Sequence, residues 1–150
     1  MSPEVVHVLL GRIPKSIPSP CRVLGYSRHP VKDRVYPAMI PADKNSHVDG
    51  MIWLDLSERE MQAFDFFEED DYQRRLLQIQ ILAKNDNSMV PTDDNEIVQA
   101  EGYIWTNPLS QLELNAEWSY ENFCQQHLEW YLSNTVAICK RELDLLKQQD

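Results

Sequence analysis

The sequence is short of several features that would define a class of protein on their own. Its 150 residues include only three cysteines and four glycines, and 14 lysines and arginines stand against 24 aspartates and glutamates. The formal net charge of −10 argues against a nucleic-acid backbone or an anionic membrane as the main partner. No apolar run approaches the roughly 18 residues that a membrane-spanning helix needs. The N-terminal Met-Ser-Pro-Glu does not have the pattern of a signal peptide.

The cysteines and histidines predict neither a disulfide framework nor a metal centre. Cys21, Cys124 and Cys139 are odd in number and lack metal-ligand spacing, which is typical of reduced thiols in a cytoplasmic protein. The histidines are scattered one per segment, at His7, His29, His47 and His127. We therefore expect no metal ion and no cofactor.

Length and composition favour one folded domain over residues 1–150, with a helical tail at 133–150. The hydrophobic fraction of 43% and the charged fraction of 25% are ordinary for a folded protein. The order of elements is neither βαβ alternation nor an all-β meander, so we predict an α+β fold with a small, barrel-like mixed or antiparallel sheet and flanking helices. The expected elements are a helix over 3–10, strands over 22–28, 34–41 and 47–54, a helix over 58–68, strands over 72–83 and 96–106, and helices over 118–146.

Two helix starts carry clear capping signals. Ser2 is a good N-cap, Pro3 is suited to the first helical position, and Gly11 is suited to end the helix. Ser57 is followed three residues later by Glu60, which is the pattern of a capping box. These signals predict where both helices begin.

Several local expectations follow from apolar patterning. Gly50 suggests a bulge or a close backbone approach, and the nearly continuous apolar run of 72–83 predicts a strand that is buried on much of both faces. The polar stretch 84–95 predicts a surface loop. In the last helices, the residues expected to pack are Phe123, Leu128, Trp130, Tyr131 and Val136.

Glu68 lies in a run of four consecutive acids at the end of the second predicted helix. At about 100° per residue, its side chain points only ~20° away from that of Met61, on the buried side, whereas Glu69 points toward water. A carboxylate directed inward is costly unless it is paired, metal-bound or protonated, and such groups are often functional. The alternative is that the helix ends before Glu68 and that the acids form a solvated turn.

The chain resembles the γ-glutamylcyclotransferase-like family, in the plant and fungal branch that is named for avirulence-induced genes. The segment 64–75 matches the family's "LDxFExxxYxRR" motif, with Phe64 in place of the usual leucine. Further matches run through nearly the whole chain. They are LGRIP at 10–14, LGY at 24–26, RVYPA at 34–38, YIW at 103–105 and EW at 117–118.

The resemblance implies an enzyme that releases an amine and 5-oxoproline from a small γ-glutamyl substrate. It assigns the glutamate of the "FE" pair, Glu68, as the catalytic acid/base. Tyr36, Tyr72 and Tyr103 lie beside matched motifs and are candidate walls of the substrate pocket, although core packing is the alternative for each. We expect Arg74 and Arg75 to form structural ion pairs, with substrate binding as the alternative.

One family feature is missing from the sequence. Members begin with a strand that ends in a "YGTL"-type motif, which holds the substrate's glutamyl carboxylate, and this chain has no Tyr-Gly pair. Residues 1–6 align just after that motif, so we expect an N-terminally truncated member. The alternative function is that of a catalytically inactive, truncated relative that acts as a binding or interaction module. The sequence does not predict the oligomeric state.

Overall fold

The chain divides into two sets of segments that make most of their contacts internally. The computed structural model describes residues 1–85, 88–91 and 97–149. The first set, here the helical unit, consists of Met1–Lys15, Asp55–Glu69 and the residues from Ser119 onward. The second, here the sheet unit, consists of Ser16–Leu54 and Asp70–Trp118. Whether residues 1–150 act as one domain stays a prediction.

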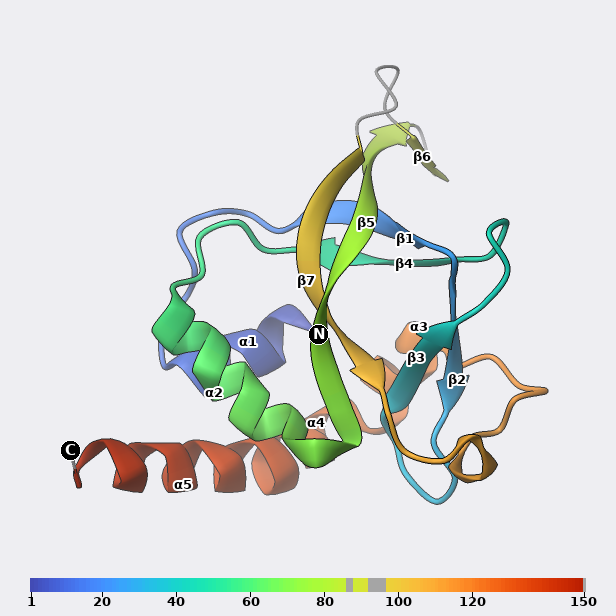
Figure 1. Ribbon diagram of the computed structural model, residues 1–150. Coiled ribbons are helices and arrows are strands. Elements are labelled where there is room, and N and C mark those ends of the chain that lie inside the picture. Colours follow the sequence, from blue (N-terminus) through green and yellow to red (C-terminus); the bar gives the residue numbers. More distant parts are fainter. Residues whose placement is uncertain (86–87, 92–96, 150) are drawn as a thin grey trace. The chain divides into compact units, whose positions relative to one another are not determined.

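The sheet unit is built from antiparallel strands. One five-stranded sheet has the order β4-β1-β5-β6, with β7 also paired to β5, and a separate two-stranded sheet is formed by β2 and β3 (Figure 1). Every described strand pair is antiparallel. Together with the helices, this confirms the predicted α+β class. The strands are β1 Ser19–Leu24, β2 Tyr26–Pro30, β3 Pro37–Pro41, β4 His47–Ile52, β5 Tyr72–Asn85, β6 Ser88–Pro91 and β7 Ile97–Trp105.

The single strand predicted over 22–28 is two strands, because the chain turns at Gly25. This glycine has a φ of 78°, a conformation that costs other residues free energy. Its N–H donates to the Ser46 carbonyl at 2.8 Å, and its own carbonyl accepts from the Ala42 N–H at 2.9 Å. Gly25 therefore ends β1, and β2 continues in the other sheet.

The strand predicted over 34–41 begins later than expected, at Pro37. Residues 31–36 form the turn between β2 and β3, in which the Arg34 N–H donates to the Val31 carbonyl at 3.1 Å. Asp33 has a φ of 61°, which breaks the extended backbone. The first residues of the RVYPA motif therefore lie in a turn.

Along most of its length the strand β5 is buried on one face, so the prediction of burial on much of both faces is wrong for this part. Leu77 and Ile79 are each 4% exposed, whereas the preceding Leu76, which points to the opposite face, is 61% exposed. That opposite face is buried further along the strand, where Leu82 is 4% exposed. Leu77 and Ile79 belong to a core whose buried residues are Cys21, Val23, Val48, Ile52, Leu77, Ile79 and Ile104.

Two further expectations about the sheet are corrected. Gly50 pairs in regular register with Cys21, and nothing lies within 4 Å of the position that a Cβ would occupy, so it marks neither a bulge nor a close approach. Part of the predicted loop 84–95 is strand, because β5 extends to Asn85 and β6 pairs with it. Residues 86–87 and 92–96 lie outside the described residues.

The first two helices of the helical unit begin where their capping signals predict. The Ser2 Oγ accepts from the Val5 N–H at 3.3 Å, and Gly11 ends the first helix with a φ of 68°. Ser57 and Glu60 form the predicted capping box. The helical elements of this unit are α1 Pro3–Leu10, α2 Glu58–Glu68, α3 Tyr120–Gln126, α4 Leu128–Tyr131, the π-helical turn Leu132–Val136 and α5 Ala137–Lys147.

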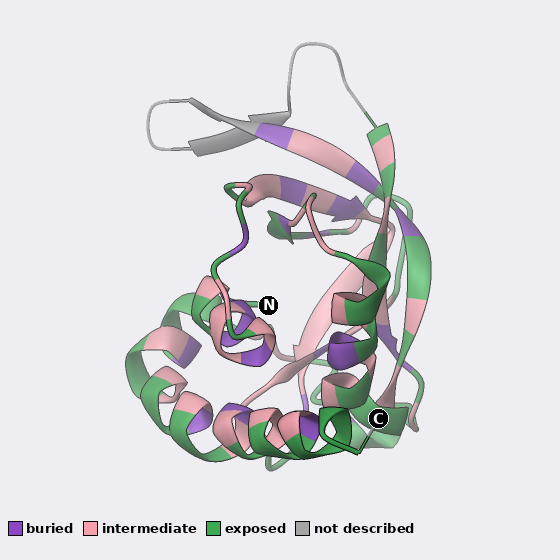
Figure 2. Cartoon of the chain, turned by 90° about the vertical axis from the view of Figure 1, so that its left-hand side faces the viewer, coloured by how far each residue is buried: buried purple, intermediate pink, exposed green. Residues whose placement is uncertain are grey.

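The C-terminal helices are buried on some faces and exposed on others (Figure 2). Phe123, Tyr131 and Val136 are buried, as predicted, and the rings of Phe123 and Tyr131 meet edge to face with centroids 5.4 Å apart. Trp130 is 59% exposed, so its predicted packing role is wrong. Adjacent positions on a helix point about 100° apart, and Tyr131 takes the buried direction.

A partly buried ion pair between Arg12 and Glu60 in the helical unit predicts a loss of stability in acid. The Arg12 Nη2 donates to Glu60 Oε2 at 2.9 Å, and this guanidinium holds the pKa of the Glu60 carboxyl at about 2, below its ordinary 4.5. Because the folded pKa is depressed, the stabilisation is present above pH 4.5 and is lost as the pH falls toward 2. Urea unfolding of Arg12→Met should therefore show a weaker dependence of the free energy of unfolding on pH in this window.

Arg59→Met is the matched control for that experiment, because Arg59 is an exposed arginine on α2, the helix that carries Glu60. Its acid dependence should equal that of the unmodified protein. An Arg12→Met protein with an unchanged acid dependence would contradict the assigned role of the ion pair.

Candidate active site

Glu68 is the last residue of α2, so the alternative in which the helix ends before it is wrong. On the same helix Ala63 and Phe64 are buried and Glu68 is half-buried, and Glu69, directly after the helix, is exposed. The element α2 packs against α1 and α5 within the helical unit. The capping box at its start and the buried Phe64 along its length position the helix end that carries the carboxylate.

Burial raises the pKa of the Glu68 carboxyl to about 7. Surrounding protein atoms displace the water that would solvate the charged form, and the proton is therefore held more tightly. A carboxyl that titrates near neutrality can both accept and donate a proton at working pH.

The backbone is strained directly after Glu68. Glu69 has a φ of 55° and a ψ of −156°, a conformation essentially restricted to glycine, and its N–H donates to the Asp65 carbonyl. Such a conformation costs about 1–3 kcal/mol and is often found at functional sites. The sequence offered no signal for it, because a glutamate stands where a glycine would be expected.

An aromatic contact fixes the residue that precedes Glu68. The Phe67 ring meets the Tyr131 ring edge to face, with centroids 6.3 Å apart. Tyr131 is 8% exposed and packs in turn against Phe123. The C-terminal end of α2 thus contacts α4 through Phe67 and Tyr131, and α4 in turn contacts α3 through Tyr131 and Phe123.

Two of the three candidate tyrosines pack against one apolar cluster in the sheet unit. The buried residues of this cluster are Val31, Ala38, Trp105 and Leu112, and Tyr36 and Tyr72 are partly buried against it. The Tyr72 hydroxyl donates to the Pro37 carbonyl at 2.7 Å, and its ring lies 5.3 Å from that of Trp105.

Tyr103 lies on β7 opposite Arg74 and is half-buried. Strand alternation places it on the same face of β7 as Trp105. Arg74 forms an ion pair with Glu101, at 3.5 Å between Nη1 and Oε2, which is the structural role expected of it. Glu68 belongs to the helical unit and the tyrosines to the sheet unit, so a pocket that they share stays a prediction.

Residues 1–85, 88–91 and 97–149 contain neither a metal-binding cluster nor a membrane-spanning helix. Among these residues, no group of three or more His, Cys, Asp or Glu is placed to hold a metal ion. Within the same ranges, no helix combines the length and apolar character needed to cross a bilayer. Cys21, Cys124 and Cys139 are free thiols.

Comparison with known proteins agrees with this fold and with the motifs. A family model described as "Gamma-glutamyl cyclotransferase, AIG2-like" matches residues 1–124. The chain belongs to this family. It is 30% identical over 149 residues to "AIG2-like protein D" of Arabidopsis thaliana, which covers 99% of this chain and 89% of that protein. It is 31% identical over 133 residues to "AIG2-like protein C" of the same plant, which covers 89% of this chain and 69% of that protein.

Solved structures show the same fold. One protein of Arabidopsis thaliana, whose structure was determined in solution, superposes with a TM-score of 0.59 at 25% identity, over 98% of this chain and 78% of that one. A second solution structure from the same plant gives a TM-score of 0.59 at 23% identity, over 88% and 79%. The resemblance that the motifs predicted is thereby confirmed at the level of family and fold.

Proposed function

We propose that this protein is a γ-glutamylcyclotransferase-type acyltransferase that releases an amine and 5-oxoproline from a small γ-glutamyl compound in the cytoplasm. Family membership supports the reaction class. The observation that carries the proposal is Glu68, whose position matches the "FE" glutamate of the family motif and whose carboxyl has a pKa of about 7.

In the proposed mechanism the α-amine of the γ-glutamyl group attacks its own γ-amide carbonyl carbon. A new C–N bond closes the five-membered ring, and the original amide C–N bond breaks. The Glu68 carboxylate accepts a proton from the attacking nitrogen and returns it to the departing nitrogen, so protons and charges balance over the cycle. One group can serve both transfers because its pKa lies near the working pH.

We also propose that Tyr36, Tyr72 and Tyr103 contribute to the walls of the substrate pocket. The Tyr72 hydroxyl is already bonded to the Pro37 carbonyl, so we expect Tyr72 to contribute its ring rather than a hydrogen bond to substrate. The half-buried state of Tyr36 and Tyr103 is compatible with the same role.

The proposal is tested by incubating the full chain with γ-glutamyl amino acids, glutathione and γ-glutamyl-lysine, and by measuring 5-oxoproline. We expect release above the rate of spontaneous cyclisation, which heat-denatured protein would report. If none of the three substrate types yields 5-oxoproline, the alternative of an inactive binding module is favoured instead.

The activity should also depend on pH through Glu68. A general base must be deprotonated, so kcat/KM should rise through an ionisation of the free enzyme near pH 7 and fall about tenfold from pH 8 to pH 6. The ionisation of the substrate ammonium, determined separately by NMR titration, would be subtracted from the profile. If kcat/KM instead rose with an apparent pKa near 4.5, the ordinary pKa of glutamate, the assignment of Glu68 as this base would be contradicted.

A further inference from the structure

A loop of the sheet unit, residues 109–116, is fastened to β2 by backbone pairing. Val31 and Leu112 form an antiparallel bridge. On either side of it, the Lys32 N–H donates to the Gln111 carbonyl at 2.9 Å and the Glu113 N–H donates to the Pro30 carbonyl at 3.0 Å. The loop is thus held in one register against the end of β2.

The far end of this loop is held by a histidine. The His29 Nδ1 lies 3.0 Å from the Ala116 carbonyl oxygen, which can only accept, so Nδ1 carries the proton. In the neutral imidazole Nε2 is then an acceptor, and the Ser27 hydroxyl at 2.9 Å donates to it. Two residues further on, the Trp118 Nε1 donates to the Val35 carbonyl at 2.9 Å. The loop is therefore preformed.

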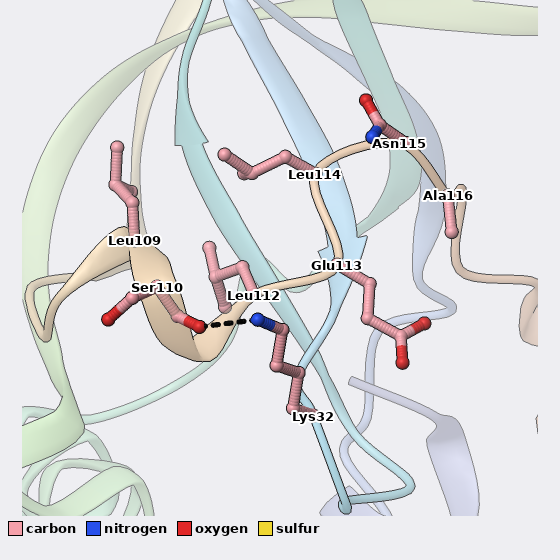
Figure 3. A pocket seen from close by; sticks show the side chains of 8 residues that line it. All are labelled: Lys32, Leu109, Ser110, Leu112, Glu113, Leu114, Asn115 and Ala116. Carbon is pink, nitrogen blue, oxygen red and sulfur yellow. Dashed lines mark hydrogen bonds between the residues drawn. The ribbon is translucent and has the colours of Figure 1, made fainter.

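The loop borders a pocket of about 540 Å³ (Figure 3). Three leucines are among its lining residues: Leu112 is 3% exposed, Leu109 is 51% exposed and Leu114 is 46% exposed. The partly exposed side chains of Leu109 and Leu114 give the pocket an apolar part of its lining. The volume of the pocket falls within the range of ligand pockets.

Two opposite charges line the same pocket. Residues 32 and 113 are diagonal neighbours across the Val31–Leu112 bridge, and both line the pocket. The Lys32 Nζ donates to the Ser110 carbonyl at 2.7 Å. Figure 3 shows the Lys32 ammonium directed toward that carbonyl and the Glu113 carboxylate directed away from it.

The charges of Lys32 and Glu113 are therefore not paired with each other. In the part of the chain that the structure describes, no ion pair joins them. Lys32 uses one of its three N–H donors on the Ser110 carbonyl and keeps two, and Glu113 keeps its acceptor oxygens. The pocket thus presents one cationic and one anionic group beside an apolar surface.

We propose that this pocket binds a small zwitterion with an aliphatic side chain, that is, a free α-amino acid such as leucine. Its carboxylate would face the Lys32 ammonium, its ammonium would face the Glu113 carboxylate, and its side chain would lie against Leu109 and Leu114. A ligand of one charge sign leaves either Lys32 or Glu113 without a partner. None of Glu68, Tyr36, Tyr72 or Tyr103 is among the residues that line the pocket, so the proposed ligand would contact other residues than those of the proposed function.

The test is a ¹⁵N-NMR titration of the full chain with L-leucine and three analogues that each lack one feature. The analogues are 4-methylpentanoate without the ammonium, 3-methylbutylamine without the carboxylate, and glycine without the side chain. We expect leucine to shift amide signals of residues 31–32 and 109–116, and each analogue to bind about tenfold more weakly, because each loses a charged hydrogen bond or the apolar contact. The absence of a shift, or equal affinity for all four, would overturn the proposal.

Variants locate the binding groups. Lys32→Met and Glu113→Gln should each weaken leucine binding about tenfold, and Glu113→Gln keeps the backbone bond to Pro30. Lys44→Met, at an exposed lysine of the same unit outside the pocket, is the matched control and should bind leucine as the unmodified chain does. If Lys32→Met and Glu113→Gln both keep the original affinity in folded protein, leucine does not bind through these two groups.

Discussion

Glu68→Gln is expected to lower 5-oxoproline release by about a thousandfold or more while leaving the fold intact. A general acid or base typically accelerates a reaction by about 10²–10⁴-fold, and in the proposed mechanism one carboxyl serves two proton transfers. The amide of glutamine keeps the shape of the side chain but cannot exchange the proton. The measurement is single-substrate kinetics on the full chain, with circular dichroism to verify folding.

Glu69→Gln is the matched control, because its side chain is exposed and the strained backbone is retained. Its turnover should stay within about twofold of the original, since substitutions of exposed side chains seldom affect stability and the Glu68 carboxyl itself is unchanged. Substantial turnover in Glu68→Gln, at the level of Glu69→Gln, would remove Glu68 from the mechanism.

Unfolding measurements on the same Glu68→Gln variant give an independent readout. The folded-state pKa of about 7 lies above the ordinary value of 4.5, so the folded protein loses stability as the pH rises from 4.5 to 7. Glutamine removes that penalty, which is of the order of 3 kcal/mol if all of the shift reflects the folded state. The variant should therefore be more stable than the original protein above pH 7, although it is less active.

Phe64→Ala is expected to destabilise the protein by about 3–5 kcal/mol, the usual cost of truncating a buried phenylalanine to alanine. Phe64 is 3% exposed on the helix that ends at Glu68. Phe64→Leu, which restores the usual residue of the family motif, should cost far less because most of the apolar volume remains. Urea unfolding followed by circular dichroism measures both.

Phe66→Ala is the control for Phe64→Ala, because Phe66 lies on the same helix and is 38% exposed. Truncation there should cost clearly less than at Phe64, since more than a third of Phe66 is already exposed and less buried area is lost. Equal destabilisation by the two alanine substitutions would contradict the burial that distinguishes these two phenylalanines.

Local signals predicted the helix starts well. Ser2, Pro3 and Gly11 act within a few bonds of the backbone that they cap, as do Ser57 and Glu60, so their effect does not depend on distant parts of the chain. The class of fold was also accessible, because the order of elements restricts the architectures that can bury their apolar faces.

Tertiary features were less accessible from the sequence. The apolar run in β5 does not indicate that Leu76 faces solvent, because a covered and an uncovered sheet face can carry the same residues. Trp130 and Tyr131 are both large aromatics, and only the helix direction decides which one is buried. The pairing of β6 with the end of β5 depends on a register that short polar segments specify weakly.

In the candidate site, too, the local features were predictable from the sequence and the non-local contacts were not. Helix phase predicted that the Glu68 side chain points to the buried side, because Glu68 lies on a regular helix whose start is fixed by a cap. Glu69 lies after the end of that helix, so its exposure does not follow from the helix phase. The edge-to-face contact of Phe67 with Tyr131 joins residues far apart in the sequence, and periodicity within α2 carries no information about it. The pocket beside loop 109–116 depends on the Val31–Leu112 bridge, which is likewise non-local.

The division of the chain between the two units has a consequence for synthesis on the ribosome. The sheet unit is complete in sequence once Trp118 has emerged, whereas the helical unit needs the residues from Ser119 onward. Because contacts can form only between residues already made, the sheet can fold during translation while α1 and α2 still lack the partners of α3 to α5. Until those last helices arrive, the apolar faces of α1 and α2, with Val6 and Phe64, remain exposed to chaperones and to proteolysis.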